Sequence, residues 1–114
     1  MKLPSEAKLL RIFIGEADKL EGKPLYEVIV NLARKQGMAG ATVIRGLMGF
    51  GANSRMHTAK ILRLSEDLPI VIEIVDKPEN IDTLLPHLDG IIKEGMVTLE
   101  KVRVISYRCN SNKI

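Results

Sequence analysis

Two stretches of the chain alternate apolar side chains with a period of two residues, which is typical of β-strands. Residues 8–15 read KLLRIFIG and residues 69–76 read PIVIEIVD. Both faces of each predicted strand are largely apolar, which indicates a sheet that is covered on both sides. Two more strands are predicted over residues 41–48 and 57–64, on either side of a glycine-rich segment.

A last strand is predicted over residues 96–107. Its apolar positions change parity between Leu99 and Val102. Because a strand keeps one parity for each face, this change predicts a bulge or break near Glu100–Lys101.

Two segments have the apolar spacing of a helix instead. Pro24 suits the first turn of the first helix, and Gly37 suits the position after its end. The second helix follows Asp76, which we expect to be its N-cap, and Pro86 should kink or end it. The apolar stripes of the two helices are Leu25, Val28, Ile29 and Leu32, and Ile81, Leu84, Leu85 and Leu88.

The predicted order is β-α-β-β-α-β, the order of a ferredoxin-like α+β sandwich, with an antiparallel sheet and two helices on one face. Residues 1–114 are expected to form a single domain, with a frayed tail over residues 109–114. Two helices cover only one face of such a sheet. The apolar second face therefore predicts self-association with closed symmetry.

The composition narrows the classes of function. The chain has 114 residues, 46% hydrophobic and 27% charged, with a net charge of +3 and only 4% aromatic residues. This mild positive charge with few aromatic side chains argues against a nucleic-acid-binding protein. No apolar run approaches the ~20 residues of a membrane span, so membrane insertion is not expected. A single cysteine, Cys109, makes no internal disulfide and favours the cytoplasm.

A glycine-rich loop over residues 46–56 is the first candidate site. It lies within RGLMGFGANSRMHT, which holds Gly46, Gly49 and Gly51 between Arg45 and Arg55. The loop is longer than a tight hairpin needs, and glycine lets backbone N–H groups converge on an anion. It matches neither a Walker loop nor a GxGxxG fingerprint. A hairpin without a ligand is the alternative.

A second glycine cluster and a basic strand add candidates. In DGIIKEGMVT, Gly90 and Gly95 bracket Lys93. A helix C-cap followed by a turn also explains both glycines. Lys101 and Arg103 share one face of the last predicted strand, where they either bind an anion or are simply solvated.

Catalytic chemistry is weakly indicated. Glu73 lies mid-strand and is either a buried acid or the partner of a basic residue on a neighbouring strand, Arg11, Lys60 or Arg63. His57 and His87 have no obvious nucleophile beside them, and no metal-ligand spacing is present.

The chain resembles PII-like signalling proteins, in particular a short bacterial branch that is a domain-of-unknown-function family. The resemblance covers nearly the whole chain and is carried by GKPLYEVIV, AGATVIRGLMGFGANSRMHT, LRLSEDLPIVIEIVD and MVTLEKVRVISY. The link to PII proteins themselves rests on the element order and on GFG at residues 49–51.

The resemblance implies a homotrimer that binds an adenine nucleotide, ADP or ATP, in clefts between subunits. Here the long loop is shorter than in PII proteins and lacks their modified tyrosine, and the second loop lacks their full glycine-lysine pattern. By position, the resemblance implies ligand binding by Gly49, Gly51, Gly90, Lys93, Gly95, Lys101 and Arg103. Arg45, Gly46 and Phe50, at the start of the same glycine-rich loop, are also predicted to bind the ligand.

The leading prediction is thus a cytoplasmic, trimeric nucleotide-binding regulator that acts on a protein partner and is not an enzyme. Two alternatives stay open. One is a small enzyme that uses Glu73 or His57 as acid or base, and the other is an assembly domain without a ligand.

Overall fold

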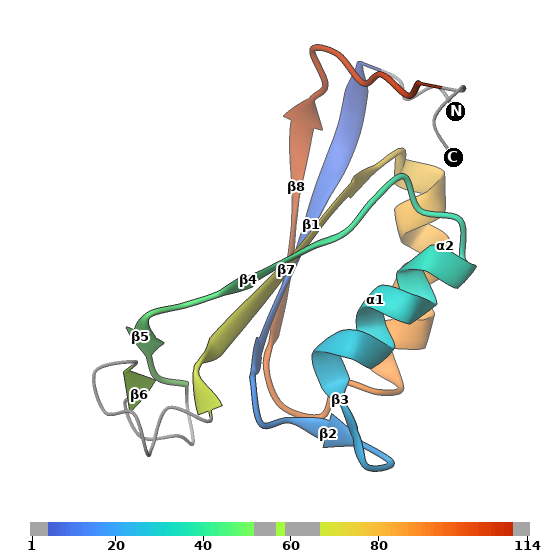
Figure 1. The fold of residues 1–114 in the computed structure, drawn as a ribbon. Coiled ribbons are helices and arrows are strands. Elements are labelled where there is room, and N and C mark those ends of the chain that lie inside the picture. Colours follow the sequence, from blue (N-terminus) through green and yellow to red (C-terminus); the bar gives the residue numbers. More distant parts are fainter. Residues whose placement is uncertain (1–4, 52–56, 59–66, 111–114) are drawn as a thin grey trace.

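The computed structural model describes residues 5–51, 57–58 and 67–110. Its centre is an antiparallel sheet with the strand order β4-β7-β1-β8. The strands are β1 (Glu6–Gly15), β4 (Thr42–Arg45), β7 (Pro69–Asp76) and β8 (Met96–Arg103). Helices α1 (Leu25–Lys35) and α2 (Pro78–Asp89) lie side by side on one face of this sheet (Figure 1). In the described part of the chain, no helix has the length and apolar character to cross a membrane.

Two small hairpins complete the fold. Strands β2 (Lys19–Leu20) and β3 (Lys23–Pro24) pair just before α1, and β5 (Met48–Gly49) pairs with β6 (His57–Thr58). The β5–β6 hairpin lies away from the helices, at the far end of β4 (Figure 1). Of the strand predicted over residues 57–64, only β6 falls within the described residues.

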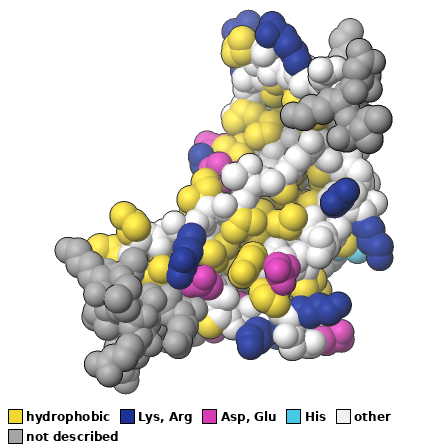
Figure 2. Space-filling view, in the orientation of Figure 1, with side chains coloured by type: hydrophobic (Ala, Val, Ile, Leu, Met, Phe, Trp, Pro, Cys, Tyr) yellow, Lys and Arg dark blue, Asp and Glu magenta, His cyan; other side chains and the backbone are white. Residues whose placement is uncertain are grey.

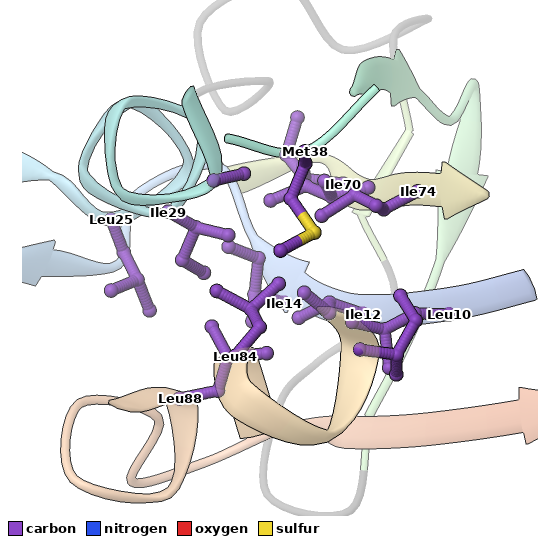
Figure 3. Packing of buried hydrophobic residues seen from close by; sticks show 13 residues of the cluster. Leu10, Ile12, Ile14, Leu25, Ile29, Met38, Ile70, Ile74, Leu84 and Leu88 are labelled. Atoms are coloured by element: carbon purple, nitrogen blue, oxygen red, sulfur yellow. The ribbon is translucent and has the colours of Figure 1, made fainter. Parts of the chain in front are cut away.

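The core forms where the alternation of β1 and β7 meets the helices. Cross-strand partners such as Leu10 and Ile74, or Ile12 and Ile72, point to the helix side and are fully buried. The helices add Leu25, Ile29, Ala33, Ile81, Leu84 and Leu88 (Figure 3). The predicted helix stripes are thus confirmed in outline.

Helix α1 ends as its sequence predicts. Gly37 has a φ of 78°, a left-handed conformation that favours glycine. Its N–H donates to the carbonyl of Arg34 at 3.1 Å, and Met38 N–H donates to Ala33 at 3.0 Å. These two bonds make a Schellman motif, which satisfies the last carbonyls of the helix.

The predicted N-cap of α2 is wrong, and so is an end of the helix at Pro86. Its N-cap is Lys77, while the buried Asp76 carboxylate accepts hydrogen bonds from Ala39 N–H (2.7 Å), Lys77 N–H (2.7 Å) and the Asn80 amide (3.0 Å). Asp76 therefore ties the loop after α1 to the start of α2. Pro86 neither ends nor divides the helix, which continues to Asp89. Because Pro86 is exposed and near the helix end, a carbonyl left without its N–H donor can be hydrated there.

The predicted bulge in β8 is also wrong. Strand β8 pairs with β1 without a slip, from Phe13 opposite Met96 to Glu6 opposite Arg103, and it ends at Arg103 instead of residue 107. The parity changes because Leu99 lies opposite Leu10 on the helix side, whereas Val102 lies opposite Ala7 on the other face. An apolar residue fits either face of this sheet, so apolar parity alone does not reveal a bulge.

The face without helices is largely apolar. It carries Leu9, Phe13, Ile44, Val71, Val75 and Met96. At its centre, Arg11 Nε donates to Glu73 at 2.8 Å, and Arg11 Nη1 donates to Glu100. Among the described residues no helix covers this face.

Candidate functional site

Two pockets lie at opposite ends of β8. The first, here called the loop pocket, has a volume of about 530 Å³. It is formed by the base of the β5–β6 hairpin and the start of β8, and its lining includes Gly49, Phe50, Gly51, Glu94, Gly95 and Met96. The structure therefore brings four of the predicted site residues together here: Gly49, Phe50, Gly51 and Gly95.

The described lining of the loop pocket offers apolar contact and carboxylates but no cation. Phe13, Met48, Phe50 and Met96 line it together with Asp18, Asp67 and Glu94, and none of its described lining residues is Lys or Arg. Asp18 accepts a hydrogen bond from Gly15 N–H at 2.9 Å, and Asp67 accepts one from Ala17 N–H at 3.0 Å. The pocket therefore suits a flat, partly apolar group better than a phosphate.

Packing explains part of the glycine pattern in this region. A Cβ on Gly95, which has a φ of 144°, would lie 2.4 Å from the carbonyl oxygen of Phe13. A Cβ on Gly49 would lie 2.8 Å from Pro69 Cγ. Gly46 N–H donates to Pro69 O at 2.7 Å, at the point where the chain leaves the main sheet for the hairpin. Gly95 and Gly49 therefore have a structural role, whatever they bind.

The second pocket, here called the strand-end pocket, has a volume of about 560 Å³. It lies where β1 begins and β8 ends, and its lining is Ser5, Glu6, Ala7, Lys8, Pro78, Lys101, Val102 and Arg103. Lys101 is directly opposite Lys8, and Arg103 is directly opposite Glu6. As predicted, Lys101 and Arg103 share one face of the strand. In the described part of the chain, none of the three cations forms an ion pair.

Four predicted residues line neither pocket. Arg45 Nε pairs with Glu16 at 3.1 Å, and Gly46 makes the bond to Pro69 given above. Gly90 is the C-cap of α2 with a φ of −77°. This agrees with the alternative interpretation of Gly90 as a helix C-cap. Lys93 is exposed in the turn that follows.

Lys8 is the pocket residue that the sequence prediction missed. It has the parity of Leu10 and Ile12, so a lysine occupies a position that the alternation assigns to the core side. A charged residue at a position with core parity is the sequence signal that could have identified Lys8 as a site residue.

The acid–base candidates gain no catalytic arrangement. Glu73 is paired with Arg11, and its hydrogen bond raises the pKa of the Arg11 guanidinium above the ordinary value. The His57 backbone pairs with Gly49, but its side chain is outside the described part of the structure, and His87 is exposed. No group of described side chains is arranged to hold a metal ion.

Comparison with known proteins identifies the family of this chain. Residues 7–104 match DUF190, whose description is Uncharacterized ACR. The chain belongs to the DUF190 family. A UPF0166 protein of Aquifex aeolicus is 41% identical over 98 residues, which cover 86% of this chain and 92% of that protein. A UPF0166 protein of Methanocaldococcus jannaschii is 39% identical over 100 residues, which cover 87% and 92%.

Solved structures place this DUF190 protein in the PII-like fold. CPII, a nitrogen regulatory PII-like protein from Thiomonas intermedia K12 bound to ADP, AMP and bicarbonate, has a TM-score of 0.68 at 23% identity, over 87% of this chain and 88% of CPII. A PII-like signaling protein from Thermus thermophilus has a TM-score of 0.65 at 18% identity, over 88% and 90%. The ferredoxin-like, PII-like fold predicted from the sequence is therefore confirmed.

Proposed function

We propose that this DUF190 protein is a homotrimeric regulator that binds an adenine nucleotide, ADP or ATP, between subunits and acts on a protein partner. The observation that carries the proposal is the division of the candidate residues between two unlike pockets. Arg103 and Met96 are the two ends of β8, so the pockets are roughly 23 Å apart along one strand. A nucleotide does not reach both within one chain.

The two pockets complement each other chemically. The loop pocket has aromatic and apolar side chains for a base, and the strand-end pocket has Lys8, Lys101 and Arg103 for phosphates. In a closed ring, one end of each subunit contacts the other end of its neighbour. Such an arrangement joins the loop pocket of one subunit to the strand-end pocket of the next.

The uncovered sheet face supports the assembly. Phe13 is 37% exposed, Ile44 45% and Met96 60%, on a face that no described helix covers. Burying such side chains is worth about 25 cal/mol per Å² of apolar surface removed from water. Closure with three-fold symmetry would cover this face in every subunit.

The solved relatives support the ligand and the regulatory role. CPII is bound to ADP and AMP, and the Thermus thermophilus protein is a PII-like signaling protein. Leu47, just before β5, supports a protein partner, because it is 79% exposed and offers apolar contact outside the loop pocket. Glu73 is held by Arg11, which disfavours the enzyme alternative.

Calorimetry with ATP, ADP and AMP tests the proposal. Charge-assisted hydrogen bonds are worth about 1.5–3 kcal/mol, so Arg103→Ala should weaken nucleotide binding by roughly ten- to a hundredfold. The matched control is Arg34→Ala, on the exposed side of α1, which should bind like the wild type. Sedimentation should give the same trimer for all three proteins. If no adenine nucleotide binds the wild type below millimolar concentration, the assembly-domain alternative replaces this proposal.

A further inference from the structure

Lys8 occupies an unusual position in the sheet. Its direct neighbours in the register are Asp76 on β7 and Lys101 on β8. The Asp76 carboxylate already accepts three hydrogen bonds, from Ala39, Lys77 and Asn80, and it forms no ion pair with Lys8. The half-buried Lys8 thus lies between a carboxylate that is already hydrogen-bonded and another lysine, and it forms no ion pair with any described residue.

Lys8 and Lys101 repel each other in the protein alone, although Asp76 opposite Lys8 offsets part of this repulsion. Like charges directly opposite each other on neighbouring strands destabilise a sheet. Arg103, two residues beyond Lys101 on the same face, adds a third positive charge, and Glu6 is the one carboxylate in the lining. Figure 2 shows Lys and Arg side chains at the end of the molecule where β8 ends. An anion in the pocket would relieve the repulsion.

The spacing of the cations indicates the class of anion. Side chains opposite each other in a sheet have Cβ atoms about 4.5–5.5 Å apart, and those two residues apart on one strand about 6.6 Å. The positive charge is therefore spread along an L-shaped path from Lys8 through Lys101 to Arg103. A single phosphate reaches only part of this path, whereas linked phosphates follow it.

We propose that Lys8 is a specificity-determining residue, which acts with Lys101 and Arg103 to make the strand-end pocket prefer two or more linked phosphates over one. This proposal deepens the proposed function, because it names the group that reads the phosphate chain of the ligand. It concerns one pocket of one chain, so simple inorganic anions test it separately from adenine recognition.

The experiment is calorimetric titration of the full chain with inorganic tripolyphosphate, pyrophosphate and phosphate. The wild type should bind tripolyphosphate more tightly than phosphate. Lys8→Gln should weaken tripolyphosphate binding by about tenfold, since a hydrogen bond to a charged group is lost, and phosphate binding by less than about threefold. Lys23→Gln is the matched control, because it removes the same charge from an exposed residue in the β2–β3 hairpin. Lys101→Gln is the second variant, in case Lys8→Gln folds poorly.

A stability measurement adds a readout that a merely structural lysine would not give. Without any anion, Lys101→Gln should raise the melting temperature by a few degrees, because in the described sheet Lys101 has only Lys8 opposite it and the substitution removes the lysine–lysine repulsion. Lower affinity together with higher stability supports the proposal.

Three results would overturn it: no tripolyphosphate binding by the wild type, equal losses in Lys8→Gln and Lys23→Gln, or equal losses for phosphate and tripolyphosphate. The proposed function fails differently. If ATP, ADP and AMP do not bind but tripolyphosphate shows the Lys8 dependence, only the adenine nucleotide assignment is wrong.

Discussion

Substitution of Gly95 tests the local structure at the start of β8. A side chain there has two separate energetic costs, one from the backbone conformation and one from a steric clash. The residue has a φ of 144°, and an added Cβ would lie 2.4 Å from the backbone oxygen of Phe13. A side chain in such a conformation costs about 1–3 kcal/mol, and the clash with a backbone atom adds to it. We expect Gly95→Ala to lower the free energy of unfolding by about 2–4 kcal/mol in total.

Two other glycines separate these costs. Gly37 has a φ of 78° with no atom within 4 Å of the added Cβ, so Gly37→Ala should cost about 1 kcal/mol from the backbone alone. Gly90 has a φ of −77° with its nearest neighbour at 3.8 Å, so Gly90→Ala should be neutral or slightly stabilising.

Thermal and urea unfolding of the three variants, at one protein concentration, measures the series. A small domain loses about 4–8 °C of melting temperature for each kcal/mol, so Gly95→Ala should melt well below Gly37→Ala. If Gly95→Ala is as stable as Gly90→Ala, the close contact with Phe13 and the reasoning built on it are wrong.

Three further predictions concern the rest of the molecule. Asp76→Ala should lower the free energy of unfolding, measured in urea, by about 2–4 kcal/mol, because it leaves Ala39 N–H and Lys77 N–H without their acceptor. The control Asp82→Ala, at an exposed position of α2, should change it little. Phe13→Asp should convert the proposed trimer to monomers in sedimentation, since it places a charge on the uncovered face; a persistent trimer would remove that face from the interface. Glu73→Gln should leave nucleotide affinity unchanged in calorimetry, because Glu73 is paired with Arg11 and lines neither pocket; a large loss of affinity would restore Glu73 as a site residue.

The fold was predictable where the signal is local. The alternation of β1 and β7, the apolar stripe of α1 and its end at Gly37 depend on residues close in sequence, and the structure confirms them. The bulge near Glu100 was wrong because an apolar residue suits either face of this sheet.

The candidate site was predictable only in part, because register and distant contacts decide it. The sequence does not show that Lys8 lies opposite Lys101, and therefore does not show the charge cluster. It also does not show that Gly49 packs on Pro69, which gives that glycine a structural role. Asp76 was expected to be the N-cap of α2, but the N-cap is Lys77, and the Asp76 carboxylate accepts a hydrogen bond from Ala39, far away in the sequence.

Mixing two defective variants tests the shared site between subunits most directly. Phe50→Asp impairs the loop pocket, and Arg103→Ala impairs the strand-end pocket, so neither trimer alone should bind ATP well. Co-expressed in equal amounts, the two chains should form mixed rings in which about a quarter of the interfaces join an intact loop pocket to an intact strand-end pocket. Calorimetry of the mixed trimer should then show that fraction of sites with wild-type affinity. If co-expressed chains bind ATP no better than each variant alone, the site does not lie between subunits.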